Sequence, residues 1–195
     1  MRSACVVLGA GAGTRFGEPK AGARVRDGIR FVDAVVDTAR AAGLSPIVVV
    51  GPPMLTPPSG ARFVPNPDAA GEQIHSLRLG LAQLTNAAVD GAVAWPVDHP
   101  FVELASVLAL LDAARLTGAP IVVPVYDTRR GHPVYFSREV WRELMTVPTG
   151  GARAVVHAHA ARVHAVAVDS PGVVRDIDTP ADMRRAEEGM RDAVS

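Results

Sequence analysis

The sequence predicts an α/β fold with a mainly parallel sheet. Short apolar runs rich in β-branched residues alternate with longer segments of helical periodicity, which is the pattern of repeated strand, helix, strand units. The first apolar run, residues 4–8, is continuous, as expected for a strand buried on both faces, and it leads into a glycine-rich loop. A length of 195 residues suits one hydrophobic core, so we expect residues 1–195 to form a single domain.

The other elements are predicted in order from periodicity and end signals. In residues 31–42 the apolar side chains share one helical stripe and Gly43 follows as a stop, so we expect a helix there and a strand at 47–50. Residues 51–60 contain four prolines and no periodicity, which predicts a surface loop. Further helices are expected at 71–84 and 152–161, and further strands at 92–97, 120–126 and 163–168.

Three helix predictions depend on individual residues. Ser137 is expected to cap a helix that runs to Met145, and Thr179 to cap a last helix with Pro180 at its first position, where the missing N–H costs nothing. A helix at 103–116 is predicted from an apolar stripe through Leu104, Val107, Leu108 and Leu111.

Composition excludes several classes of protein. With 48% hydrophobic and 21% charged residues the chain is too apolar for a disordered protein. Its formal net charge of zero provides no overall field to attract nucleic acid or an anionic membrane, and no apolar run approaches the roughly 20 residues of a membrane span. A lone cysteine, Cys5, cannot form an intramolecular disulfide, and the N-terminus makes a poor signal peptide. We therefore expect a cytoplasmic protein.

The loop after the first strand is the most informative segment. Residues 8–20 read LGAGAGTRFGEPK, in which glycines can turn backbone N–H groups toward an anion while Arg15 and Lys20 add positive charge. Lys20 is the single lysine beside nineteen arginines. The spacing fits neither the dinucleotide fingerprint nor the P-loop. We interpret the loop as a phosphate cradle; the alternative is a glycine-rich turn with two solvated cations.

Two aspartates are candidates for a metal site. Asp98 follows a predicted buried strand and so lies at its carboxyl end, where open α/β sheets bind ligands. Asp178 ends an extended segment, just before the helix capped by Thr179, and could reach a cation held by Asp98. The alternatives are a turn aspartate before Pro100 and an aspartate that favours the positive end of the following helix.

Weaker candidates complete the set. Asn66 and Ser76 lie around the start of a predicted helix, a suitable place to hold a base or a phosphate, although Asn66 is also an ordinary turn residue. His132 lies in a Gly-His-Pro turn and could contact a substrate, or could simply be solvated. Trp95 and Trp141 are expected in the core.

Taken together and in order, these segments resemble the molybdenum-cofactor nucleotidyltransferases, and most closely their cytidylyltransferase branch. The family opens with a loop of the form L-A-A-G-x-G-x-R-x-G-x-P-K, from which residues 8–20 depart only at Gly9. The resemblance covers nearly the whole chain. It continues through Asn66-Pro67, Ser76-Leu77, Val97-Asp98-His99-Pro100, Gly131-His132-Pro133 and Asp176-Ile177-Asp178-Thr179-Pro180.

The resemblance implies a fold, a reaction and a site. The fold is the three-layer α/β/α sandwich of the nucleotide-diphosphosugar transferases. The reaction joins a nucleoside monophosphate from CTP to a phosphate-bearing acceptor, with molybdopterin as the expected acceptor, and releases pyrophosphate. The implied partners are those two substrates and, transiently, a molybdoenzyme or its chaperone. The alternatives are a guanylyltransferase or sugar-phosphate nucleotidyltransferase on the same fold, or a non-catalytic module that binds a nucleotide or cofactor.

By the same resemblance each candidate residue receives a role. Asp98 and Asp178 would hold Mg2+, and His132 would contact the acceptor. Arg15, Lys20 and Asp98 would be catalytic. The nucleotide would be bound by Leu8, Gly9, Ala10, Gly11, Gly13, Arg15, Lys20, Asn66 and Ser76.

Overall fold

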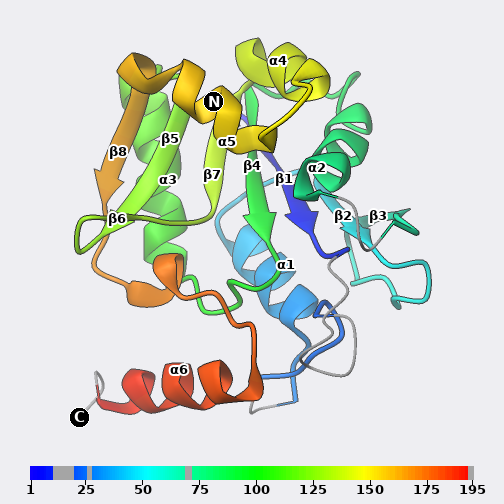
Figure 1. Ribbon diagram of the computed structural model, residues 1–195, viewed down its shortest axis with the longest axis vertical. Coiled ribbons are helices and arrows are strands. Elements are labelled where there is room, and N and C mark those ends of the chain that lie inside the picture. Colours follow the sequence, from blue (N-terminus) through cyan, green and yellow to red (C-terminus); the bar gives the residue numbers. More distant parts are fainter. Residues whose placement is uncertain (11–19, 26–27, 69–71, 193–195) are drawn as a thin grey trace.

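A mixed sheet of eight strands forms the centre of the molecule (Figure 1). The computed structural model describes residues 1–10, 20–25, 28–68 and 72–192. The strands are β1 (Ser3–Leu8), β2 (Ile47–Gly51), β3 (Arg62–Pro65), β4 (Gly91–Pro96), β5 (Ile121–Tyr126), β6 (Arg129–Arg130), β7 (Val134–Ser137) and β8 (Val163–Ala167).

The strand order confirms the predicted fold class. The order is β3-β2-β1-β4-β7-β5-β6, and β8 also pairs with β5. Strands β3, β2, β1 and β4 are mutually parallel, as are β5 and β8. Strand β7 is antiparallel to both of its neighbours, β4 and β5. The sheet is therefore mainly parallel and joins two parallel groups through one reversed strand.

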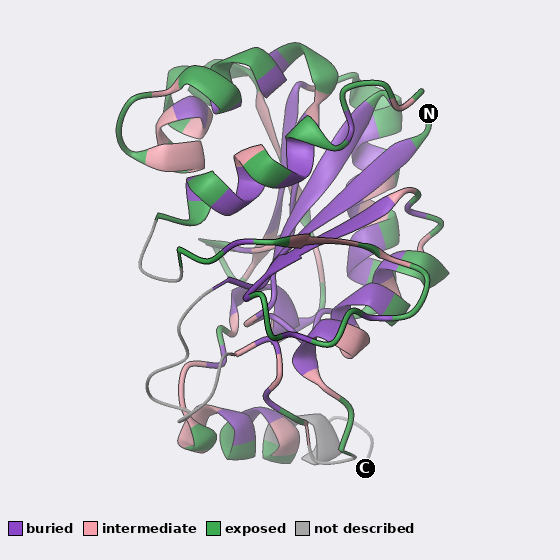
Figure 2. Ribbon diagram, turned by 90° about the vertical axis from the view of Figure 1, so that its right-hand side faces the viewer, coloured by how far each residue is buried: buried purple, intermediate pink, exposed green. Residues whose placement is uncertain are grey.

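Helices cover both faces of the sheet, which gives three layers (Figures 1 and 2). Helices α1 (Phe31–Ala41) and α3 (Leu104–Thr117) pack on one face. Helices α2 (Gln73–Ala82), α4 (Trp141–Thr146) and α5 (Gly151–Ala158) pack on the other. Helix α6 (Pro180–Asp192) lies across the end of the molecule toward which β1 and β4 point. No helix in the described part of the chain is long and apolar enough to cross a membrane.

Successive residues of β1 belong to opposite sides of the sheet, as the two-residue period of a strand requires. Cys5 and Val7 are buried with α1 and α3, whereas Val6 belongs to the cluster beneath α2 and α4. All three are fully buried, which explains why the sequence of this strand is continuously apolar. Trp95 and Trp141 are also buried, as predicted.

One predicted helix exposes a different face from the expected one. Helix α3 forms where predicted, but Leu104 is 39% and Leu108 is 43% exposed. Val107 of the predicted stripe is fully buried, and the other buried residues of this helix are Ser106, Leu110, Ala113 and Ala114. Apolar residues surround most of this helix, so the sequence period alone does not select the side that meets the sheet. The prediction of the buried stripe was wrong for this reason.

The ends of two other helices can be compared with their predicted caps. Thr179 Oγ1 accepts a hydrogen bond from the Asp182 backbone N–H at 3.2 Å, which confirms the cap of α6. The cap at Ser137 was wrong, because a 3-10 turn, Arg138–Val140, precedes α4 and the Ser137 hydroxyl caps nothing. Strand β3 was not predicted because its four residues are partly exposed and only two of them, Phe63 and Val64, are strongly apolar.

Candidate active site

The candidate site lies at the carboxyl ends of β1 and β4. These strands are parallel and paired in register from Ser3 with Gly91 to Leu8 with Pro96, so the segments that follow them leave the sheet at the same edge. Lys20 follows β1, and Asp98 comes two residues after β4 ends. Parallel strands thus bring together groups that are 78 residues apart, at the edge where open α/β sheets bind ligands.

The centre of the site is an ammonium group between two carboxylates. Lys20 Nζ donates to Asp98 Oδ2 at 3.0 Å and also to Asp178 Oδ1. The Ile177 backbone N–H donates to the Asp98 carbonyl at 2.8 Å, which fixes the segment carrying Asp178 beside the end of β4. Burial disfavours the charged form of Lys20, but the hydrogen bonds and charges of Asp178 and Asp98 outweigh it and raise the pKa of this lysine.

The carboxylates of this site suit a hard divalent cation. Mg2+ and Mn2+ prefer carboxylate oxygens, and here two carboxylates from distant segments converge on one positive charge. In addition, Asp98 Oδ1 is buried and has no hydrogen-bond partner among the described residues. A buried carboxylate oxygen of this kind needs a cation or a donor. Asp98 and Asp178 therefore fit the metal that the sequence resemblance implies.

A pair of histidines borders the carboxylates. The rings of His99 and His132 lie with their centroids 5.0 Å apart. His132 is held by its own backbone N–H, which donates to the Val173 carbonyl at 2.7 Å. Burial, followed by the nearby His99, lowers the pKa of His132 to about 4, so the ring is neutral at pH 7. Its Nδ1 atom is buried without a hydrogen-bond partner in the described chain, which leaves it available to a ligand.

Two adjoining cavities lie along this edge. The larger, of about 860 Å³, extends between α2, α5 and the sheet and is lined by Leu8, Phe136, Arg130, His132 and Arg153, among others. The smaller, of about 300 Å³, contains Asp98 and His99. Arg130, Gly131 and His132 line both cavities. An arginine and the neutral His132 therefore stand between the larger cavity and the carboxylate site.

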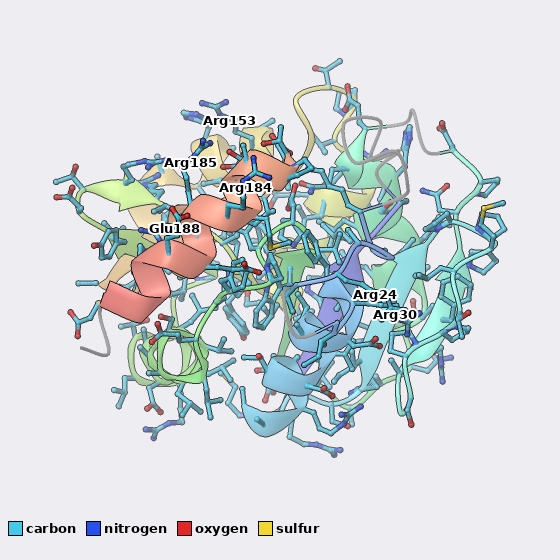
Figure 3. All side chains as sticks on the ribbon, turned by 90° about the horizontal axis from the view of Figure 1, so that it is seen from below. Arg24, Arg30, Arg153, Arg184, Arg185 and Glu188 are labelled. Atoms are coloured by element: carbon cyan, nitrogen blue, oxygen red, sulfur yellow. The ribbon has the colours of Figure 1, made fainter. Side chains whose placement is uncertain are left out.

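Arg130 and Arg153 are site residues that sequence reasoning missed. Neither side chain has an ion-pair or hydrogen-bond partner among the residues that the structure describes. Arg153 is exposed, and Figure 3 shows it near the rim of the molecule in the view from below. The sequence signal was a nearby glycine, because glycines allow a backbone to border a cavity closely: Gly131 follows Arg130, and Gly150 and Gly151 come shortly before Arg153.

Asn66 and Ser76 lie side by side, because their side chains are hydrogen-bonded to each other. Asn66 Nδ2 donates to Ser76 Oγ at 3.1 Å, and Asn66 Oδ1 accepts from the Asp68 backbone N–H at 3.0 Å. Both side chains are about 95% buried, at 5% and 4% exposure. This pair fixes the turn between β3 and α2, as the turn interpretation expected.

The predicted phosphate loop is described only at its two ends. Leu8 and Ala10 are buried at the end of β1, and the Gly9 backbone N–H donates to the Val50 carbonyl at 2.7 Å. Gly9 packs closely there, because a Cβ on this residue would lie 3.2 Å from the Ala21 Cβ and 3.3 Å from the Val50 carbonyl. The other predicted loop residues, Gly11, Gly13 and Arg15, lie outside the described residues.

A mainly parallel sheet with a cation and paired carboxylates at its carboxyl edge is the arrangement of a nucleotide-dependent transferase. Comparison with known families makes this specific. Residues 5–177 match the MobA-like NTP transferase domain, and the chain belongs to this family of nucleotidyltransferases.

Solved structures agree with this assignment. The crystal structure of Rv0371c from Mycobacterium tuberculosis H37Rv is 30% identical, with a TM-score of 0.80 over 96% of this chain and 98% of that one. A second structure of Rv0371c, in complex with manganese, is also 30% identical, with a TM-score of 0.76 over 96% and 99% of the two chains. A nucleotidyl transferase from Methanothermobacter shares the fold at 19% identity, with a TM-score of 0.76 over 97% and 98%. A search of curated protein sequences gave no match.

Proposed function

We propose that the protein is a Mg2+-dependent cytidylyltransferase that joins CMP from CTP to a phosphate-bearing acceptor, with molybdopterin as the favoured acceptor, and releases pyrophosphate. The observation that carries the proposal is the convergence of Lys20, Asp98 and Asp178 at the carboxyl ends of the parallel strands. A non-catalytic binding module would have less need of a lysine and two carboxylates at one point. CTP and molybdopterin are favoured by the motif resemblance described above.

The residues have the following roles in this proposal. Lys20 and Arg15 bind the triphosphate, and the loop amides that follow Gly9, up to Gly13, cradle it, since the Gly9 N–H itself donates to the Val50 carbonyl. The Asn66 and Ser76 pair fixes the wall beside the nucleoside. Asp98 and Asp178 hold Mg2+, which when bound neutralises charge on the phosphates.

A strong general base is not needed for this reaction. The second pKa of a phosphate monoester is about 6, so the acceptor oxygen is already ionised at pH 7. The protein then contributes by aligning the acceptor with the α-phosphorus and by stabilising the charge that develops. The neutral His132 fits this role, because its Nδ1 can orient an acceptor atom while its uncharged ring leaves the charge of the site unchanged.

The larger cavity is the proposed acceptor site. Its apolar floor includes Leu77, Val134 and Phe136, and its arginines, Arg130 and Arg153, suit an anionic group. A flat, partly apolar acceptor with a phosphate would match both features. We place the reaction in the cytoplasm, where nucleoside triphosphates are available, and we propose that the product is passed on by transient contact with a molybdoenzyme or its chaperone.

The experiment that tests the proposal is a thermal-shift panel of CTP, GTP, ATP and UTP, each with and without Mg2+. A ligand that binds only the folded protein raises its melting temperature. At a ligand concentration of 100 times the dissociation constant, the free energy of unfolding rises by about 2.7 kcal/mol. We expect the largest Mg2+-dependent shift with CTP. The next step is an assay for pyrophosphate release with CTP and molybdopterin.

Other outcomes would change the assignment. A larger shift with GTP would favour a guanylyltransferase on the same fold, and a shift with UTP or ATP a sugar-phosphate nucleotidyltransferase. No shift with any triphosphate would contradict the catalytic proposal and would favour a binding module.

A further inference from the structure

Lys20 and a divalent cation compete for the same two carboxylates. The Lys20 ammonium is 3.0 Å from Asp98 Oδ2 and also contacts Asp178 Oδ1, so it stands between the groups that fit a metal. A magnesium ion would lie about 2.1 Å from such oxygens. A dication and an ammonium cannot both occupy that point, and their mutual repulsion at a few ångströms is large in a half-buried site.

We propose that Lys20 is an internal counter-ion that keeps free divalent cations out of the site. When a triphosphate binds Lys20, the lysine leaves the two carboxylates and the metal can bind them. The exchange keeps a cation beside the two carboxylates throughout. In the empty site the two carboxylates are balanced in part by Lys20, and in the loaded site by the metal, while Lys20 binds phosphate oxygens. The part of this idea that concerns the triphosphate rests on the proposed function; the competition with metal does not.

The surroundings of Lys20 support this second role. The ammonium is held in place, since the exposed fraction of its side chain is 17% and its two partners come from segments 78 and 158 residues away. Asp98 Oδ1 stays buried without a partner in the described chain even though Oδ2 binds Lys20. Asp98 Oδ1 is therefore a carboxylate oxygen that the Lys20 ammonium does not contact, and a bound metal ion would give it a partner.

The first test measures Mn2+ binding by electron paramagnetic resonance in the absence of nucleotide. The variants are Lys20→Met, which keeps the length of the side chain without its charge, and Arg24→Gln as a matched control. Arg24 is an exposed cation that bonds to the Gly28 carbonyl, away from the carboxylates. We expect Lys20→Met to bind Mn2+ at least about tenfold more tightly than the wild type, because a repelling charge is removed. Arg24→Gln should bind Mn2+ as the wild type does.

Equal or weaker Mn2+ binding by a folded Lys20→Met variant would overturn the proposal. Circular dichroism at the temperature of the experiment establishes whether the variant is folded. Because this measurement uses neither nucleotide nor acceptor, its outcome is independent of whether the protein transfers CMP.

The second test uses the wild type and needs no variant to fold. Lys20 is the single lysine of the chain, so labelling with 13Cε-lysine gives one side-chain signal. Mg2+ is titrated into the metal-free protein while its binding is followed by calorimetry, and we expect the Lys20 signal to shift over the concentration range in which Mg2+ binds. A non-hydrolysable CTP analogue should lower the Mg2+ concentration needed. Binding of Mg2+ while the Lys20 signal stays constant would show that metal and lysine occupy separate points.

Discussion

The proposed chemistry depends most directly on one group, the carboxylate of Asp98. We predict that Asp98→Asn lowers Mg2+-dependent turnover by at least about 100-fold, the usual cost of removing one group that stabilises developing charge. The melting temperature should stay near that of the wild type, since the backbone bond from Ile177 to the Asp98 carbonyl does not involve the side chain. Steady-state rates and a thermal melt check this. A variant that unfolds would identify Asp98 as a structural turn residue.

Lys20 should contribute to affinity for any triphosphate and little to the choice of base. We predict that Lys20→Ala weakens binding of CTP and GTP by a similar factor, about 10- to 100-fold, as expected for the loss of a hydrogen bond between charged groups. Isothermal titration with each nucleotide measures both affinities. Unchanged triphosphate affinity would contradict the role of Lys20, and a change confined to CTP would assign it to base recognition.

His132 gives the folded protein a pH dependence in the mildly acidic range. Its pKa falls from 6.5 to about 4, lowered by burial and then by His99, while the charges of Asp98 and Asp176 act in the opposite direction. Between these values the unfolded chain binds a proton that the folded chain resists, so stability is complete above pH 6.5 and is lost as the pH falls toward 4.

We therefore predict that His132→Gln loses less stability than the wild type between pH 7 and pH 5. Urea unfolding of both proteins at the two pH values, without metal, measures the difference. The same loss in both proteins would show that His132 does not carry this dependence. His164→Gln, the same substitution on β8, is measured beside it as the matched control.

At the scale of elements, one close contact fixes the strand turn that carries His132. A Cβ on Gly131 would lie 2.2 Å from the Val173 carbonyl oxygen, a backbone atom that cannot move aside as a side chain would. We predict that Gly131→Ala lowers stability by about 2 kcal/mol or more, because overpacking forces a backbone shift. Gly43→Ala is the comparison: it meets no atom within 4 Å and has a φ of +77°, so about 1 kcal/mol is expected. Chemical denaturation of both variants ranks the two costs.

Much of the element order could be predicted from the sequence, and the exceptions have physical causes. Buried strands such as β1 and β4 are continuously apolar, so their positions were clear. Helix α3 was placed correctly with the wrong face, because leucines nearly surround it and only the sheet decides which side is covered. Edge strand β3 was missed because a partly exposed strand of four residues has no distinct pattern.

The same distinction applies to the candidate site. Asp98 could be predicted because a carboxylate directly after a parallel strand must lie at the binding edge of the sheet. Lys20 was marked by composition, as the single lysine among arginines. The direct contact between Lys20 and Asp178 could not be predicted, since it depends on how the segment before α6 returns to β4. Arg130 and Arg153 were missed because their role becomes visible only with the cavity that they line.

At the scale of the whole molecule, the proposed acceptor cavity adjoins a smaller cavity that contains Asp98. We predict that Arg130→Gln and Arg153→Gln each raise the KM for the acceptor by about tenfold, the effect of losing one hydrogen bond between charged groups, and leave the KM for CTP within about twofold. Arg115→Gln, on the outer side of α3, serves as the control for loss of a surface arginine. A rise in the KM for CTP instead would move the nucleotide into the larger cavity.

The distance along the chain between Lys20 and Asp178 has a consequence for how the protein is made. These residues are 158 positions apart, and Asp178 comes after all eight strands of the described sheet. During synthesis, a ribosome-bound chain can form β1 to β4 and expose Asp98 long before Asp178 has been translated. The two carboxylates become neighbours only after the segment that carries Asp178 has emerged, so a chain still growing toward Asp178 has no paired-carboxylate trap for cellular metal ions. On the proposed function, nucleotide turnover would begin only once that segment has returned to the end of β4.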